Sequence, residues 1–259
     1  MIFDTHAHYD DDAFAEDRDR LLTGLKDRGV DLVINVGAAL PSLDQIPELL
    51  KQYPFMYGAI GIHPDEVGGL NDEILARMRI LLRQPKVVAV GEIGLDYHWN
   101  VEERKTQIYW FERQIQLARE EKLPVAIHSR DAAEDTLETA KRNHLEEIGG
   151  VVHCFSYSKE LAREYLNMGM YIGVGGVITF KNARRLKEVV EYAPLDRLLL
   201  ETDCPYLAPE PNRGKRNDSG NLKYVAEAIG RIKGVDPEKV IEQTERNGMR
   251  LFQINKAGG

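Results

Sequence analysis

The stretch DLVINVG, from Asp31 to Gly37, is an almost uninterrupted apolar run with branched side chains at its centre. Runs of this kind are typical of parallel strands, because helices cover both faces of a parallel sheet and bury both sets of side chains. VVAV at Val87–Val90 and LLLE at Leu198–Glu201 have the same character. The three runs favour a buried parallel sheet.

Similar short segments recur along the whole chain and alternate with longer segments of helical period. The expected strands are Ile2–His8, Asp31–Gly37, Met56–His63, Val87–Asp96, Pro124–Ser129, Gly150–Phe155, Met170–Gly176 and Leu198–Cys204. The expected helices are Glu16–Arg28, Ser42–Gln52, Asp72–Arg83, Val101–Lys122, Ala132–Asn143, Lys159–Met168, Ala183–Tyr192, Leu222–Lys233 and Asp236–Phe252. Eight such units in a row, with no break in composition, predict an α/β fold, a (β/α)8 TIM barrel, rather than a doubly wound sheet. We expect one domain over residues 1–255 and a loose tail over 256–259.

The composition limits the classes of function. The chain has 259 residues, with 34 Lys and Arg against 42 Asp and Glu, a net charge of -8. A protein that coats nucleic acid is normally basic, so any nucleic-acid chemistry here must use a local site. No apolar run approaches the ~18 residues of a membrane span, which excludes an integral membrane protein. Nothing in the sequence indicates an obligate protein partner.

The two cysteines, Cys154 and Cys204, are too few for a disulfide framework. We expect both to be reduced and packed on the faces of their strands that point away from the barrel interior. The N-terminal residues lack the basic and apolar segments of a signal peptide, so a cytoplasmic location is expected.

Histidines and carboxylates stand on or at the ends of several expected strands. Active sites of such barrels lie at the C-terminal ends of the strands. His6 and His8 are two residues apart, so on a strand both point to the same side. Such a pair of imidazoles binds borderline metals well. Four more metal-capable side chains reach the same rim from other strands: Glu92, His128, His153 and Asp203. The six together predict a metal site.

The arrangement resembles the amidohydrolase-like metal-dependent barrels and, more narrowly, the TatD family of metal-dependent deoxyribonucleases. The matching stretches run nearly end to end in the order of the family, and no ligand position departs from its pattern. They are FDTHAH at Phe3–His8, GIHP at Gly61–Pro64, VGEIGLDYH at Val90–His98, PVAIHSRDA at Pro124–Ala132, HCF at His153–Phe155, ETDCPYL at Glu201–Leu207 and PNRGKRN at Pro211–Asn217. Many related barrels carry a carboxylated lysine on the fourth strand, where this chain has Glu92. That difference argues against the amidase and phosphotriesterase branches.

The resemblance implies two divalent metal ions, with Glu92 as the bridging and catalytic carboxylate between them. It assigns the first ion to His6, His8, Glu92 and Asp203, and the second to Glu92, His128 and His153. Asp203 is expected to be the general base, with a plain ligand role as the alternative. Histidine ligands favour Zn, Mn, Fe or Ni over Mg, whereas the resemblance points to magnesium-supported activity, so the metal stays open. The implied substrate is DNA, cleaved from single-stranded ends by an exonuclease.

Other residues near the rim have two readings each. His63 is expected to contact the phosphate or the leaving group, or else to be a buried structural histidine. Glu201 lies one layer deeper than Asp203 and is expected to orient a ligand histidine by a hydrogen bond, or else to form a structural ion pair. Asp96 and Tyr97 are candidates for contact with the substrate, and His98 is given no role.

The segment after the last strand, residues 205–220, is long for a barrel turn and carries Arg213, Lys215 and Arg216. On an acidic chain this basic cluster favours phosphate binding, although such clusters are often solvated surface. Arg130 is a further candidate for that patch. Three aromatic residues near the rim could stack on a base or pack the rim: Phe155, Tyr157 and Tyr206.

Two other functions remain open at this point. A metallohydrolase of the same fold could act on a small phosphate or carboxylic ester, because the fold does not settle the substrate. A metal-dependent binding protein without turnover is the third reading. The presence of both Glu92 and Asp203 counts against it.

Overall fold

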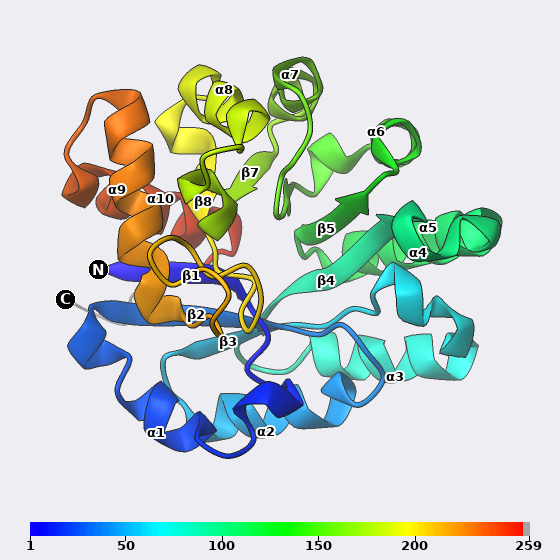
Figure 1. The fold of residues 1–259 in the computed structure, drawn as a ribbon. Helices are drawn as coiled ribbons and strands as arrows, with labels where there is room; N and C mark the ends of the chain where they lie inside the picture. The colour runs from blue at the N-terminus through cyan, green and yellow to red at the C-terminus, as the bar shows by residue number, and fades with distance from the viewer. Residues whose placement is uncertain (256–259) are drawn as a thin grey trace.

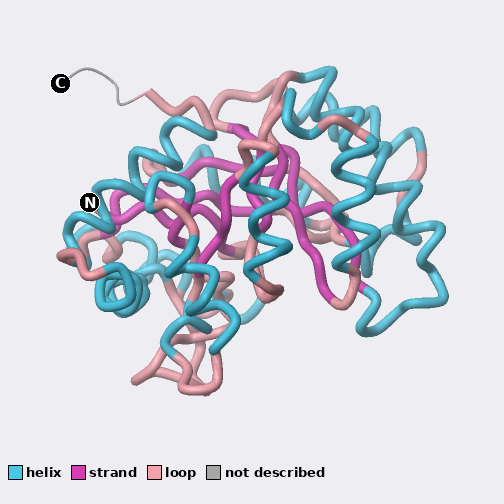
Figure 2. Tube along the Cα trace, turned by 90° about the horizontal axis from the view of Figure 1, so that it is seen from above, coloured by secondary structure: helices cyan, strands magenta, loops and turns pink. Residues whose placement is uncertain are grey.

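The computed structural model describes residues 1–255 as a parallel sheet of eight strands that follow one another in chain order. Helices alternate with the strands and surround them (Figures 1 and 2). The strands are β1 Ile2–Ala7, β2 Val30–Val36, β3 Met56–Ala59, β4 Val87–Asp96, β5 Val125–Arg130, β6 Gly150–Val152, β7 Tyr171–Val174 and β8 Leu198–Leu200. The predicted (β/α)8 barrel is confirmed. The tail expected over 256–259 lies outside the described residues.

All the helices except α4 were expected from the sequence, with differences at their ends. Those of the barrel and its C-terminal extension are α1 Arg18–Thr23, α2 Ser42–Gln52, α3 Asp72–Leu82, α4 Tyr97–Asn100, α5 Arg104–Glu121, α6 Ala133–Arg142, α7 Lys159–Asn167, α8 Arg184–Tyr192, α9 Leu222–Lys233 and α10 Pro237–Leu251. Side-chain caps fix several starts, because Asn71, Ser158 and Asp236 each accept a hydrogen bond from a backbone N–H of the first turn. None of the helices described is long and apolar enough to cross a bilayer.

Two apolar cores fill the barrel and its shell. The larger lies between the outer faces of the strands and the helices, and it includes Leu22, Ile46, Phe111 and Ile229. The smaller fills the barrel near the N-terminal ends of the strands. It contains Phe3, Ile34, Ala59, Ala89, Ala126, Val151, Tyr171 and Leu199, together with Leu251, Phe252 and Ile254 from the end of the chain. This inner layer leaves the C-terminal ends of the strands for polar side chains.

Register shifts in two strands change which residues face inward. The pairing of β1 with β2 shifts between Asp4 and Ala7, and that of β4 with β5 shifts between Val90 and Ile93. On a regular strand Ala89 and Glu92 would face opposite sides, because they are an odd number of residues apart. The irregularity adds a residue to β4 and lets Glu92 join the inner face.

The barrel closes at a seam between β1 and β8, where residues 1–255 form one isolated bridge, from Ala7 to Cys204. Backbone hydrogen bonds extend the closure, from His8 N to Cys204 O and from Asp203 N to His6 O. The buried carboxylate of Asp4 also spans the seam.

The carboxylate of Asp4 accepts hydrogen bonds from His6 N, from both N and Oγ1 of Thr202, and from Ser219 Oγ. Burial raises the pKa of Asp4 to about 6. Side-chain bonds therefore replace part of the missing ladder at this seam.

Several strands end earlier than the sequence predicts. β6 stops at Val152 and β8 at Leu200, and the backbone turns left-handed just beyond them, at Cys154 (φ 45°) and Asp203 (φ 57°). A left-handed residue cannot continue a regular strand. Both cysteines are free, as expected, but only Cys204 is fully buried, whereas Cys154 is half-buried on its turn.

Candidate metal centre

The strands β1, β4 and β8 bring one group of predicted ligands together. His6 Nε2 and His8 Nε2 are 3.2 Å apart, and His8 Nε2 is 3.3 Å from Asp203 Oδ1. Glu92 Oε2 completes the group, at 3.4 Å from His6 Nε2 and 3.6 Å from His8 Nε2. The donors of His6, His8 and Asp203 therefore form one close group at the mouth of the barrel, with Glu92 Oε2 beside the two histidines.

The other oxygen of Glu92 faces a second group. Glu92 Oε1 is 2.6 Å from His153 Nε2 and 2.8 Å from His128 Nδ1, and these two nitrogens are 3.4 Å apart. The backbone of His153 continues the strand, because its N–H donates to Ile127 O. The carboxylate of Glu92 thus lies between the two groups with one oxygen directed at each.

The donors fit divalent cations. Two ligand atoms that are each about 2.1 Å from a tetrahedral ion lie about 3.4 Å apart, which is close to the spacings of the first group and to that of the two histidine nitrogens of the second. Glu92 Oε1 lies closer to those two nitrogens, at hydrogen-bond distance. His8 Nδ1 lies 2.8 Å from Val36 O, so in the neutral ring the proton sits on Nδ1 and Nε2 presents its lone pair to the site. Imidazole and carboxylate are also ligands that borderline metals accept.

The electrostatics favour a cation in this place. Burial alone would raise the pKa of Asp203, but its hydrogen bond with His8 and the charges of His153, His8 and His6 together lower it. For His8 burial would lower the pKa, and the bond to Asp203 and the charges of Asp203 and Glu92 raise it instead, to about 10. The pull of these carboxylates on a proton at His8 is the pull that a metal ion would feel.

Asp96 is a residue whose role the sequence left undecided. It was a candidate for contact with the substrate, but its carboxylate is buried, with Oδ2 2.9 Å from His128 Nε2 and Oδ1 accepting from His98 N. A carboxylate on the far nitrogen of an imidazole fixes the ring's orientation and tautomer. Asp96 therefore positions His128, with Nδ1 of that ring directed at Glu92.

Glu201 lies beneath the second group, as its place in the chain predicts. It is fully buried, Oε1 accepts a hydrogen bond from Cys154 N, and the same oxygen is 3.9 Å from His153 Nδ1. A Cβ on Gly173 would lie 2.3 Å from the carboxylate, so the neighbouring strand makes room for it. Burial raises the pKa of Glu201 to about 7.

His63 lies at the lip of the site, beyond the end of β3. Its Nδ1 accepts a hydrogen bond from Asp65 N, which places the proton of the neutral ring on Nε2. That Nε2 is 3.9 Å from Glu92 Oε1, and the ring packs edge-on against His128. Burial lowers the pKa of His63 to about 4, so the ring is a neutral donor directed toward the ligands.

The basic cluster after β8 is less open than the sequence implies. The guanidinium of Arg216 donates two 2.7 Å hydrogen bonds to the carboxylate of Asp17 and one to Ala13 O, and it lies over the ring of Phe14. Arg213 lies over Phe180, 4.2 Å from the ring centroid. Lys215 is exposed, and its side chain makes no ion pair within residues 1–255. The three predicted phosphate contacts therefore differ, and Arg216 is committed to the protein.

The three aromatic candidates also differ in how far they are exposed to a ligand. Phe155 is buried in the core, and Tyr157 OH bonds Ser129 Oγ. Tyr206 is the exposed one of the three, with its hydroxyl donating to Asp11. Phe155 is therefore part of the rim packing.

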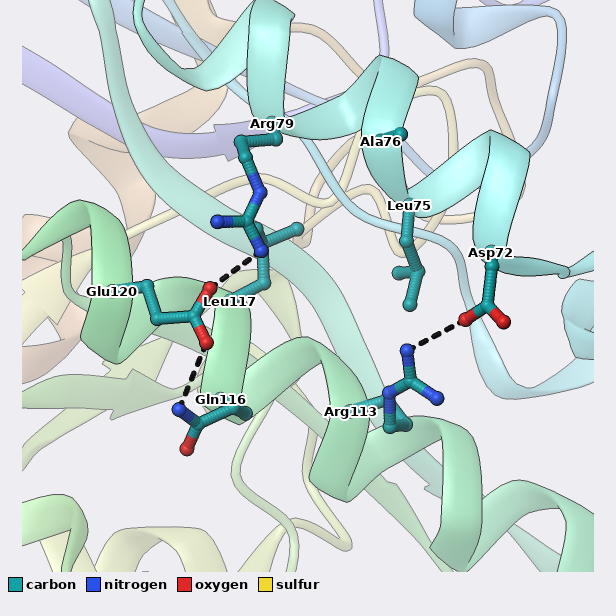
Figure 3. Close-up of a pocket in the computed structure, with 8 residues that line it drawn as sticks. All are labelled: Asp72, Leu75, Ala76, Arg79, Arg113, Gln116, Leu117 and Glu120. Carbon is teal, nitrogen blue, oxygen red and sulfur yellow. Dashed lines mark hydrogen bonds and ion pairs between the residues drawn. The ribbon is translucent and has the colours of Figure 1, made fainter.

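A groove of about 170 Å³ lies elsewhere, on the outer helical layer between α3 and α5. Figure 3 shows ion pairs across it, from Arg113 to Asp72 and from Arg79 to Glu120. It contains none of the predicted site residues and is a cleft between surface helices.

Comparison with known proteins decides the family. The family model described as "TatD related DNase" matches residues 3–253. The chain belongs to the TatD family. As a TatD-family protein it is a metal-dependent hydrolase, and the cluster of histidines and carboxylates is where its chain can hold metal.

The relatives of this TatD-family chain match it over nearly its full length. The "Uncharacterized metal-dependent hydrolase YabD" of Bacillus subtilis (strain 168) is 44% identical and covers 98% of this chain and 100% of its own. The "3'-5' ssDNA/RNA exonuclease TatD" of Erwinia billingiae is 32% identical, with 98% and 99% covered. The crystal structure of YJJV, a TatD homolog from Escherichia coli K12, superposes with a TM-score of 0.92 at 31% identity, covering 98% of each chain.

Proposed function

We propose that this TatD-family protein hydrolyses phosphodiester bonds of single-stranded DNA from an end, as an exonuclease with two divalent cations. The observation that carries the proposal is the carboxylate of Glu92, whose oxygens face two separate groups of donors. Two ions on opposite sides of a bridge are the arrangement that serves displacement at phosphorus. One relative bears the name of a 3'-5' ssDNA/RNA exonuclease, which supports the same substrate class. The free thiols fit the reducing cytoplasm that we propose as its location.

Six side chains would hold the two ions. Glu92 would bridge them, with the remaining ligands of the first ion on or just beyond β1 and β8 and those of the second on or just beyond β5 and β6. The first set is His6, His8 and Asp203, and the second is His128 and His153. When bound, the two cations would polarise the phosphodiester, lower the pKa of an attacking water and neutralise charge on the leaving oxygen.

Asp203 would accept the proton of that water. Its lowered pKa keeps the carboxylate ionised at neutral pH, so it is ready to act as a base. Its Oδ1 is held by His8, and its side chain is 18% exposed at the mouth, which leaves it within reach of solvent. The left-handed backbone at Asp203 directs this side chain across the seam toward β1.

His63 would bind the substrate beside the ions. As a neutral ring with its proton on Nε2, it can donate one hydrogen bond to a phosphate oxygen or to the leaving group. Lys215 and Arg213 would contact phosphates further along the strand. Arg216 would serve the same loop from its ion pair with Asp17, by holding the loop against the turn at Asp12–Phe14.

The test begins with metal analysis of the purified protein. Single-stranded DNA, duplex DNA and RNA, labelled at either end, are then digested with Zn, Mn, Ni, Fe or Mg in turn. We expect stepwise shortening of single-stranded DNA and none with Glu92→Gln, a variant of nearly equal size. Hydrolysis of small phosphate or carboxylic esters without cleavage of any nucleic acid would overturn the proposal and favour a small-ester hydrolase.

A further inference from the structure

Trp99 is a large apolar side chain left in solvent at the mouth of the barrel. It is 67% exposed, and it lies on α4, the short helix that directly follows β4. Figure 1 shows α4 in the segment that continues from the end of β4, the strand that carries Glu92 and Asp96. Trp99 is not among the candidate residues that the sequence indicates.

Two side chains contact the indole, one from β5 and one from α4 itself. The guanidinium carbon of Arg130 lies over the ring, 5.5 Å from its centroid. His98 meets the ring edge-on, with centroids 4.5 Å apart, and His98 Nδ1 is 3.0 Å from Asp131 Oδ2. One face of the indole is therefore supported by a cation while much of the ring stays open to solvent.

Arg130 follows a proposed ligand on the same strand. His128 and Arg130 are two residues apart on β5, so both point to the inner face with their Cα atoms about 6.6 Å apart. Arg130 pairs in register with Asp96, the residue that bonds His128. The platform thus begins one step outward from the second group of donors.

Arg130 differs from the arginine of the β8 loop in its partners. Arg216 is bound by the carboxylate of Asp17, whereas Arg130 makes no ion pair within the described residues 1–255. A guanidinium with no carboxylate partner keeps its charge and donors for an incoming anion, and a phosphate accepts such a fork well.

We propose that Trp99 is a stacking platform for one base of a single-stranded nucleic acid, and that Arg130 beneath it binds the adjoining phosphate. This subsite deepens the proposed function and rests on it. Stacking on an aromatic ring tolerates every base, because each has a π-face, so the subsite selects single strands without selecting sequence. It also separates a nucleic acid from a small ester, which has no base to stack.

The test combines an oligonucleotide that lacks one base with a protein variant that lacks the indole ring. Oligothymidylates carrying one abasic nucleotide, placed in turn at each position near the cleaved end, are digested by the wild type and by Trp99→Ala. We expect the wild-type KM to rise about 10-fold at one position, the scale of a single stacked base. In Trp99→Ala the KM for the intact oligomer should rise by the same factor, and the abasic penalty at that position should vanish. The kcat should change less than about two-fold, because the ring touches no reacting atom.

Two further variants separate stacking from structure. Trp99→Phe keeps a ring and should restore most of the abasic penalty. Tyr192→Ala removes a 46% exposed ring at the last residue of α8, at the opposite end of the barrel from the strand ends, and should behave as wild type. An abasic penalty of equal size in wild type and Trp99→Ala at every position would overturn the platform.

A binding measurement keeps the platform testable apart from the chemistry. The chain has two tryptophans, so Trp110→Phe leaves Trp99 as the single tryptophan, whose fluorescence can be excited apart from that of the tyrosines. In this variant, combined with Asp203→Asn, an oligothymidylate should quench the fluorescence, and an all-abasic oligomer of equal charge should quench it far less. Base-dependent quenching without cleavage by the parent protein would uphold the platform and reject the nuclease chemistry. Cleavage with equal quenching by both oligomers would reject the platform alone.

Discussion

The two sides of the barrel mouth differ in how many of their cations are available to a ligand, and the difference is opposite to what their sequences suggest. The β8 side carries three cations within four residues, yet Arg216 is bound to Asp17 and Arg213 lies on Phe180. The β4–β5 side carries an inconspicuous Arg130, which has no carboxylate partner among the described residues and supports an exposed indole. A count of charges therefore does not give the charge available to a ligand. The partners of each cation decide it, and they come from distant parts of the chain.

The largest effect on activity is expected at Glu92, which lies between the two sides of the barrel mouth. Glu92→Ala removes the carboxylate between both groups of donors, so we expect a loss of activity of more than about 1000-fold, since both ions depend on it. At least one ion per chain should be lost as well, measured by elemental analysis against Glu92→Gln. Full metal content with full activity would mean that neither side of the mouth surrounds a binuclear centre.

The next largest effect is expected on the β8 side, from its proposed general base and not from its cations. Asp203→Asn keeps the size and one oxygen but cannot accept a proton, so turnover should fall about 100- to 10,000-fold, the range of general-base catalysis. Part of the metal should remain. Near-normal turnover in steady-state assays would show that Asp203 acts as a ligand only and that the proton goes elsewhere.

The cations of the two sides can be compared by salt dependence. Each lost phosphate contact to a single strand flattens the slope of log K against log[salt] by about 0.7. We expect that change for Arg130→Ala and for Lys215→Ala, and none for Arg216→Ala, whose charge is already paired. Affinity is measured by fluorescence anisotropy between low and moderate salt. A flatter slope for Arg216→Ala with no change for Arg130→Ala would invert the comparison.

The smallest effect is expected at the ion pair between Arg216 and Asp17. The hydrogen bond and charge of Arg216 lower the pKa of Asp17 from its ordinary 3.8 to about 2. Since the folded pKa lies below the unfolded value, the pair stabilises the protein above about pH 4, and this contribution is lost as the pH falls toward 2. In Arg216→Ala the pKa of Asp17 should return toward 3.8, followed by NMR of the carboxyl carbon. An unchanged pKa would leave Arg216 free for phosphate.

The fold was predictable because its signal is local. Apolar runs such as Leu32–Val36 and their alternation with helical segments are enough to predict parallel strands and a barrel. The convergence of His6, His8, Glu92, His128, His153 and Asp203 followed from the rule that barrel sites gather at strand ends. That rule needs only the order of the strands.

What the sequence did not predict depends on long-range pairing or on local backbone changes. The irregularity in β4 that turns Glu92 inward has no composition signal, and neither has the left-handed turn at Asp203. Asp96 was recognised as a rim residue, but its bond to His128 depends on the register of two strands. The glycine at position 173 leaves space for the carboxylate of Glu201, and it is a feature of the sequence that could have indicated this packing.

The seam between the first and last strands also bears on how the protein is made. His6 and His8 leave the ribosome early, whereas Asp203 and Thr202, which bond across the seam, are translated near the end. At about 5–20 residues per second, the roughly 200 intervening residues take about 10–40 s to synthesise. A nascent chain therefore waits for its last strand before His6, His8 and Asp203 can meet, and any product truncated before Asp203 lacks one donor of this half of the centre.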